Sequence, residues 1–308
     1  MEFRKLLVPL DSTPASEHAL PWALGIAERA GATLMLAHVH HAAPPVYTGM
    51  EVTGDVLLDQ TLRQSGLDYL RRLGEQLRRI GTVQVSWEQP EGSPADELCR
   101  CAIEGDIDLV VMTTHARGAV ARFLLGSVAD EFVRKAERPT LLIRPASEQA
   151  PDLASRPSVA GIWVPLDGSE LAEQVLEPAT ALARLTGAGL RLIAVAEVPE
   201  GKGHAQAELV NYTRAVPGQV GPEAGSRNAL RYLRGVAERL RASVPDVTEH
   251  VVVDHPVAQA ILNEVRSQPH PVIALATHGR GLTRLVLGSV ATDVIHHAGC
   301  PVLVYRPR

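Results

Sequence analysis

The strongest constraint on the fold of this chain is an internal repeat. The segment VPLDSTP at residues 8–14 returns as VPLDGSE at residues 164–170, so that Asp11 and Asp167 lie 156 residues apart. Each copy ends a short apolar run on an aspartate and then passes at once into a helical pattern. A single copy would indicate a turn, whereas two copies indicate a duplicated unit with a site at the end of its first strand.

Two further matches extend the repeat along both halves. THARGAVARFLLGSVAD at 114–130 matches THGRGLTRLVLGSVATD at 277–293, and the last strands TLLIRP and PVLVYRP also correspond. Such a period is far longer than the 20–50 residues of solenoid repeats and indicates domain duplication. The chain of 308 residues also exceeds the usual size of one hydrophobic core. We therefore expect a first domain at 1–146, a linker at 147–158 and a second domain at 159–308.

Within each half, short continuous apolar runs alternate with helical spacing. The expected strands are 5–10, 32–39, 83–89, 108–115 and 140–145 in the first half, and 161–166, 188–198, 247–253, 271–278 and 301–307 in the second. The expected helices are 16–31, 67–80, 94–105 and one opening at Ser127, with counterparts at 170–187, 229–243, 257–268 and one opening at Ser289. Apolar strands between helices predict an α/β fold with a parallel sheet covered on both faces. Pro21 and Pro178 fall inside the first helices and predict a kink in each.

Composition narrows the class of protein. The formal net charge is −5 and the pI is near 6.2, so the chain lacks the basic excess typical of nucleic-acid binders. Three cysteines, Cys99, Cys101 and Cys300, give no disulfide framework and fit a reducing compartment. No window approaches 18 uninterrupted apolar residues, and the first apolar run is too short for a signal segment. We expect a cytoplasmic protein without a membrane anchor.

The repeated aspartates and the GSV segments lie where a doubly wound sheet binds its ligands. Such ligands sit beyond the carboxyl ends of the strands, where Asp11 and Asp167 are expected. In SVAD, Ser127 and the acid three residues later have the spacing of a capping box, which stabilises a helix start. The glycine before the serine also lets backbone approach an anion, and free N–H groups at a helix start favour phosphate.

Taken together, VPLDGSE, the loops THARG and THGRG, the LLGSV and VLGSV segments and the ending CPVLVYRP resemble the universal stress protein family. The resemblance covers nearly the whole chain, twice. It implies two Rossmann-like domains, each a five-stranded parallel sheet of strand order 3-2-1-4-5 with helices on both faces. It also implies that the last strands of the two halves pair inside one chain, and it leaves open a further homodimer.

The resemblance implies ATP or another adenine nucleotide as the ligand, with or without Mg²⁺. The family's aspartate meets adenine, and a carboxylate can accept a hydrogen bond from the exocyclic amine. The family also uses the backbone of a valine after strand 2 and a loop of form GxxGx9G[ST]. His115 and His278 occupy equivalent loop positions and could donate to a phosphate. The predicted site residues are Asp11, Val39, Thr113, His115, Ala116, Gly126, Ser127 and Val128 in the first half, and Pro165, Asp167, Val195, Ala276, His278, Gly279, Gly288, Ser289 and Val290 in the second.

The loop departs from this pattern in both halves. Glycine is replaced at Thr113, Ala116 and Ala276, and the second loop is one residue shorter before Gly288. A side chain at such a position hinders the approach of backbone to phosphate. The second half keeps Gly279, so we expect it to be the better nucleotide site. If only one half binds nucleotide, we expect the first half to be the one without it.

Three functions therefore compete. The first is a nucleotide-binding regulatory or stress-response module, and the second is an interaction module that has kept the fold and lost the ligand. Catalysis comes third, because the sequence contains no SGGxDS, GxxxxGK[ST] or GxGxxG motif and Ser127 does not lie in a GxSxG elbow. His38 and His40 share a strand face, but no complementary Cys or carboxylate set has metal-ligand spacing. We expect no catalytic residues and no metal site.

Overall fold

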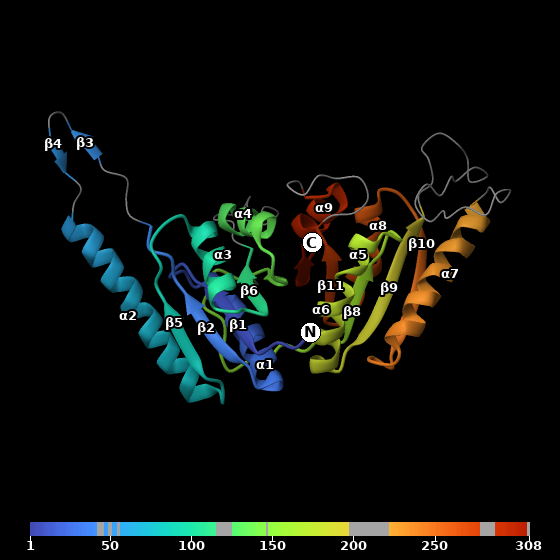
Figure 1. Cartoon of the computed structure of the whole chain (residues 1–308), viewed down its shortest axis with the longest axis horizontal. Coiled ribbons are helices and arrows are strands. Elements are labelled where there is room, and N and C mark those ends of the chain that lie inside the picture. The colour runs from blue at the N-terminus through green and yellow to red at the C-terminus, as the bar shows by residue number, and fades with distance from the viewer. Residues whose placement is uncertain are drawn as a thin grey trace.

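The structure is a computed structural model that describes residues 1–41, 46–48, 51–53, 56–114, 125–145, 147–196, 222–277 and 287–306. Its centre is one continuous sheet, which has ten strands within the described ranges (Figure 1). The strands are β1 Lys5–Pro9, β2 Thr33–Ala37, β5 Val85–Glu88, β6 Leu109–Thr113 and β7 Thr140–Ile143 in the first half, and β8 Gly161–Pro165, β9 Gly189–Ala196, β10 Val247–Val253, β11 Pro271–Ala276 and β12 Val302–Tyr305 in the second.

Each half of the sheet has the expected strand order. The first half runs β5-β2-β1-β6-β7 and the second runs β10-β9-β8-β11-β12, so both read 3-2-1-4-5 in chain order. All neighbours within a half are parallel. Helices cover both faces of the central parallel strands, which explains why the consecutive residues Leu6, Leu7 and Val8 of β1 are all fully buried.

The two halves meet through their last strands. β7 pairs with β12 antiparallel, with Leu141 opposite Leu303, and this is the internal pairing that the family resemblance implies. Arginines reinforce the joint in a reciprocal way. Arg144, just after β7, donates to the carbonyl of His296 at 2.7 Å, and Arg306, just after β12, donates to the carbonyl of Lys135 at 3.1 Å. Each half thus caps the last turn of a helix of the other half, where cations are favoured.

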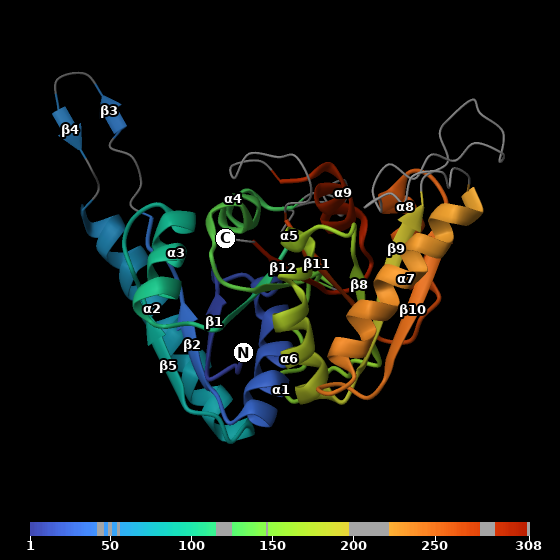
Figure 2. The ribbon, with the colours of Figure 1, turned by 45° about the vertical axis from the view of Figure 1, so that its right-hand side comes forward.

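The helices form two layers, one on each face of the sheet (Figure 2). They are the short 3₁₀ helix η1 Ser16–Ala19, α1 Leu20–Ala30, α2 Val56–Ile80, α3 Pro94–Glu104, α4 Ser127–Lys135, α5 Glu170–Glu173, α6 Leu176–Thr186, α7 Pro222–Leu240, α8 Val257–Arg266 and α9 Ser289–His297. Side chains of α1, α2, α6 and α7 join one hydrophobic core, and side chains of α3, α4, α8 and α9 join the other. Successive strand residues alternate between these cores, as Leu6 and Leu7 do.

The predicted kinks at Pro21 and Pro178 are wrong. The chain instead breaks each predicted first helix in two, so that η1 precedes α1 and α5 precedes α6. Both prolines consequently lie in the first turn of the second segment. A helix does not use the N–H groups of its first turn, so proline costs little there.

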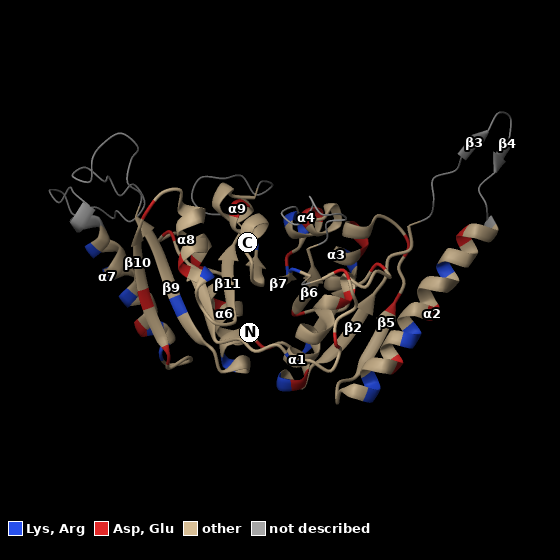
Figure 3. Ribbon diagram, turned by 180° about the vertical axis from the view of Figure 1, so that it is seen from behind, with Lys and Arg blue, Asp and Glu red and all other residues tan. Residues whose placement is uncertain are grey.

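The structure also corrects the predicted start of α2. The helix was expected at 67–80 but begins at Val56, and the segment before it holds a short antiparallel pair, β3 Val46–Thr48 and β4 Glu51–Thr53. Residues 57–65 are exposed except for the partly buried Asp59, so no apolar periodicity marks them. Basic and acidic residues are interspersed along α2 (Figure 3), including the exposed pair Arg79 and Glu75.

An ion pair fixes the segment between the halves to α1. Arg156 Nε and Nη2 donate to the two carboxylate oxygens of Glu28 at 2.7 and 2.8 Å. The Arg156 guanidinium lowers the pKa of Glu28 below its usual 4.5 through this hydrogen bond. Both side chains are about three-quarters buried, and the arrangement is bidentate.

We expect Arg156→Ala to lower the free energy of unfolding by about 1 kcal/mol at pH 7, near the upper end for partly exposed ion pairs. Because the pKa of Glu28 is lowered in the folded state, the pair stabilises fully above pH 4.5, and its contribution is lost as the pH falls through the folded pKa. Urea unfolding at pH 7 and pH 3 measures this. Equal losses at both pH values would contradict the role given to Glu28.

Candidate functional site

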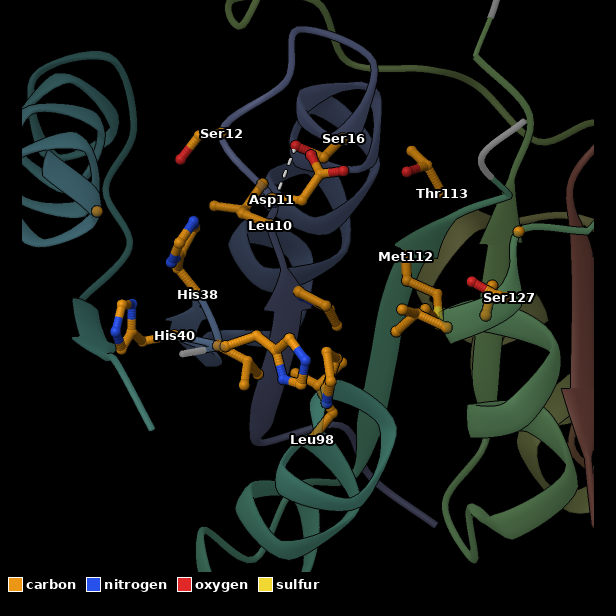
Figure 4. Close-up of a pocket in the computed structure, with 18 of the residues that line it drawn as sticks. Leu10, Asp11, Ser12, Ser16, His38, His40, Leu98, Met112, Thr113 and Ser127 are labelled. Carbon is orange, nitrogen blue, oxygen red and sulfur yellow. Dashed lines mark hydrogen bonds between the residues drawn. The ribbon is translucent and has the colours of Figure 1, made fainter. Parts of the chain in front are cut away.

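A large pocket opens at the carboxyl end of the first-half strands. It has a volume of about 1040 Å³ and lies between the ends of β1, β2 and β6, the start of α4 and the side of α2. It gathers six of the eight residues predicted for this half, which are Asp11, Val39, Thr113, Gly126, Ser127 and Val128. The other two, His115 and Ala116, lie outside the described residues. Figure 4 shows Asp11 and Ser127 on different sides of this pocket.

The turn after β1 explains why the first strand ends on an aspartate. Asp11 Oδ1 accepts from the backbone N–H of Thr13 at 3.0 Å and from its hydroxyl at 2.6 Å. Ser12 between them has a positive φ of 65°, as this turn requires. A short acidic side chain that bonds the backbone two residues on is a standard way to stabilise such a turn. The turn therefore holds the exposed carboxylate of Asp11 at the pocket.

The second half builds the same turn after β8. Asp167 Oδ1 accepts from the backbone N–H of Ser169 at 2.9 Å and from its hydroxyl at 2.6 Å. Gly168 takes the positive φ, at 78°. Ser169 in addition caps α5, because its hydroxyl accepts from Ala172 N–H at 3.1 Å. The repeated motif thus has a structural cause in both halves, and the same cause positions both carboxylates.

The capping box predicted at Ser127 is wrong. Gly126 is the residue before the helix, with extended backbone, and Ser127 is already the first helical residue. The acid of the predicted box, Asp130, accepts two hydrogen bonds from Arg134 instead. α9 begins in the same way after Gly288. In the described part of the chain, no side chain caps the start of either helix, so both starts offer backbone N–H groups to an anion.

The other predicted residues of the second half lie at matching places. Pro165 ends β8, Val195 lies near the end of β9, Ala276 ends β11, and Ser289 and Val290 open α9. Gly288 N–H donates to the carbonyl of Thr277 at 2.8 Å, which fixes the start of α9 beside the end of β11. His278 and Gly279 lie outside the described residues.

Sequence reasoning missed the contribution of α2 and of three histidines to the first-half pocket. Leu62, Ser65 and Gly66 of α2 line it, as do His38, His40 and His41 at the end of β2. His40 is 4% exposed, and its Nε2 lies 2.9 Å from Asp59 Oδ1 of α2. The stretch at 57–65 has no apolar periodicity that would predict its part in the pocket. The run HVHH is visible in the sequence, but its spacing was considered above only for metal binding. No group of three or more His, Cys, Asp or Glu side chains within the described ranges is placed to hold a metal ion.

His38 is a partly buried histidine whose surroundings disfavour its charged form. Burial lowers the pKa of His38 below its usual 6.5, and the Asp11 carboxylate offsets part of this effect. His40 on the same strand also lowers it, and the neighbouring groups from β5 and α2 are the neutral side chains of Gln89 and Tyr69. The imidazole is therefore neutral at pH 7 in the folded protein.

This lowered pKa predicts a loss of stability in mild acid. As the pH falls below 6.5, the unfolded chain takes up a proton at His38 before the folded chain does, so protonation favours unfolding. We expect His38→Gln to reduce the fall in unfolding free energy between pH 7.5 and pH 5.5, measured by urea denaturation. The same fall in His38→Gln as in the wild-type protein would contradict this prediction.

Comparison with known proteins shows which protein family this chain resembles. The family model for the universal stress protein family matches residues 2–144 and again 161–306. A universal stress protein of Mycobacterium tuberculosis is 30% identical over 306 residues, which cover 98% of this chain and 96% of the relative. Another, of Methanocaldococcus jannaschii, is 29% identical over 143 residues, which cover 46% of this chain and 82% of the relative.

Solved structures agree on the fold. A universal stress protein of Archaeoglobus fulgidus superposes with a TM-score of 0.68 at 20% identity, covering 99% of this chain and 97% of that one. A structure from Pseudomonas aeruginosa described as that of a universal stress protein gives 0.66 at 18% identity, covering 99% and 94%. Among the residues that the structure describes, no helix has the length and apolar character needed to cross a bilayer. The doubled family match and the shared fold show that this chain belongs to the universal stress protein family.

Proposed function

We propose that the protein is an adenine-nucleotide-binding regulatory module that holds its ligand without rapid turnover. The observation that carries this proposal is the first-half pocket, which brings Asp11, Val39, Gly126 and Ser127 to one place from three separate segments. Its volume of about 1040 Å³ is at the upper end for small-molecule sites and accommodates a nucleotide.

The chemistry at the two sides of the pocket matches the two ends of a nucleotide. The Asp11 carboxylate is an acceptor suited to the exocyclic amine of adenine. The start of α4, with the exposed Ser127 hydroxyl and uncapped backbone N–H groups, is suited to phosphate. Thr113 stands where the family pattern has glycine, but it is 5% exposed at the end of β6 and forms part of the pocket wall.

Isothermal titration of the full chain with ATP and with AMP tests this function. We expect saturable binding that is weakened by Asp11→Asn and by Asp167→Asn, because each removes one carboxylate from a predicted base contact. The absence of saturable binding by either nucleotide, together with no nucleotide retained on purification, would overturn the proposal. Steady product formation from ATP would overturn its second part, that the ligand is held rather than turned over.

An interaction module is the second candidate function, and α2 favours it. Leu57, Leu58 and Leu62 are 75%, 50% and 48% exposed on a part of the helix that extends beyond the sheet (Figure 1). Clustered apolar side chains of this kind mark contact surfaces more often than plain solvent faces. A protein that ignores nucleotides and loses self-association or partner binding on Leu58→Glu would favour this candidate.

A further inference from the structure

The two halves differ at the carboxyl end of the second strand of each half. The strand registers place Leu34 opposite Leu6 and Leu190 opposite Ile162, so β2 and β9 correspond at a spacing of 156 residues. His38 in the first half therefore corresponds to Ala194 in the second, and His40 corresponds to Ala196. Val39 corresponds to Val195, so the predicted valine is kept while both of its neighbours are histidine in the first half and alanine in the second.

The helix residue that faces this position is smaller in the first half than in the second. Tyr69 of α2 and Tyr232 of α7 occupy matching places, since each donates to a glutamate near the repeated aspartate turn. The same alignment places Gly66 opposite Ala229. A Cβ atom added at Gly66 would lie 3.0 Å from His38 Nδ1 and 2.2 Å from Gln89 Nε2. The first half thus pairs a large side chain with glycine, and the second pairs two alanines, which shows that space for the imidazole is built into the first half.

The imidazole is also held in a defined orientation. Gln89 Nε2 lies 3.4 Å from His38 Nδ1, and the Tyr69 ring lies edge-on at 6.3 Å between centroids. In the second half, the residue opposite Ala194 across the ladder is the apolar Val251. The first half therefore carries both the imidazole and the polar side chain beside it. With Nδ1 facing Gln89, Nε2 is the ring nitrogen left for a ligand.

His38 lies at the base end of the predicted ligand. Figure 4 shows His38 near Leu10 and Asp11, with Ser127 on the other side of the pocket. Asp11 lies near enough to His38 to affect its titration. A ligand with its phosphates at the start of α4 and its base at Asp11 brings the base to the imidazole.

We propose that His38 hydrogen-bonds a ring nitrogen of the base and, with Asp11, gives the first-half site a stronger preference for 6-aminopurine over 6-oxopurine nucleotides than Asp167 alone gives the second half. This inference rests on the proposed function. A 6-oxopurine presents a carbonyl to the Asp11 carboxylate and changes the protonation of the adjacent ring nitrogen, so both side chains are mismatched. A site whose buried polar groups are left unpaired discriminates strongly against such analogues.

The test compares ATP with ITP, which carries the same triphosphate and an oxo group in place of the amine. Titrations use the full chain with Asp167→Asn, so that the first-half site dominates, and add His38→Ala, His38→Gln or the control His18→Ala, which lies outside the pocket lining. We expect the ratio of the ITP Kd to the ATP Kd to fall about tenfold in His38→Ala, which is the effect of one hydrogen bond of ordinary strength. His38→Gln should retain part of the ratio, and His18→Ala, whose Nε2 lies 2.9 Å from the Gln149 carbonyl, should retain all of it.

The outcomes separate the inference from the function on which it rests. ATP binding with an unchanged ITP to ATP ratio in both His38 variants would overturn the role of His38 and leave the proposed function standing. Binding of neither nucleotide by the wild-type chain would overturn the proposed function and the inference with it. A stronger preference for ATP over ITP in the second half after Ala194→His with Ala229→Gly, in a chain carrying Asp11→Asn, would support the inference independently.

Discussion

Phe132→Ala is expected to lower the free energy of unfolding by about 3–5 kcal/mol, the usual cost of removing a fully buried aromatic side chain. Phe132 has no exposed surface and lies on α4 in the core that also contains α3, α8 and α9. Its loss leaves a cavity beneath a helix of nine residues, which is too short to be stable without its packing. Equilibrium denaturation in urea or guanidinium measures the change.

Phe132→Ala is also expected to affect the pocket. α4 begins at Ser127 and offers its first N–H groups to the pocket, so loosening its far side should also weaken nucleotide binding. Glu131→Ala on the exposed face of the same helix removes only a surface ion pair with Lys135 and should change stability by less than about 0.5 kcal/mol. A loss below about 1 kcal/mol for Phe132→Ala would mean that α4 does not depend on this core contact.

Asp11→Asn is expected to weaken ATP binding at the first-half site by about 10- to 100-fold, which corresponds to one hydrogen bond to a charged group. The substitution is chosen because its amide oxygen can still accept from Thr13 and preserve the turn. The other carboxylate oxygen becomes an NH₂ group, which donates and therefore opposes the exocyclic amine of adenine. The effect on folding should accordingly be small, while the effect on binding is large.

Asp108→Asn is the matched control for this measurement. Asp108 Oδ2 accepts from the backbone N–H groups of Arg4 and Lys5 at 2.8 and 3.0 Å, at the start of β1 rather than at its pocket end. We expect this change to leave nucleotide affinity unaltered. Equal affinity in the Asp11→Asn and wild-type proteins, measured with Asp167→Asn in both, would show that the first-half carboxylate does not contact the ligand.

The parts of the fold that the sequence predicted are those with a repeated or periodic signal. Continuous apolar runs predicted the strands, since parallel strands are buried on both faces, and Leu6, Leu7 and Val8 are consecutive core residues. The start of α2 gave no such signal, because residues 57–65 project from the sheet and are almost all exposed. The pocket wall formed by Leu62 and Ser65 was missed for the same reason.

Details of helix starts were less predictable. SVAD has the spacing of a capping box, but the helix begins at Ser127, one residue earlier than that interpretation requires, and Asp130 pairs with Arg134. The surroundings of the histidines could not be predicted from the sequence. The run HVHH is evident there, but only the fold shows that Asp59 of α2 lies beside His40 and that Gln89, at the end of β5, lies beside His38.

The measurement that tests the central claim most directly is mass spectrometry of the ligand released by denaturing the freshly purified full chain, quantified per chain and repeated after saturation with ATP. We expect an adenine nucleotide, at one equivalent per chain if one half binds it and at two equivalents if both halves do. Asp11→Asn should reduce the amount if the first-half pocket is occupied. A chain that carries no nucleotide and takes up none from added ATP would contradict nucleotide binding and favour the interaction module.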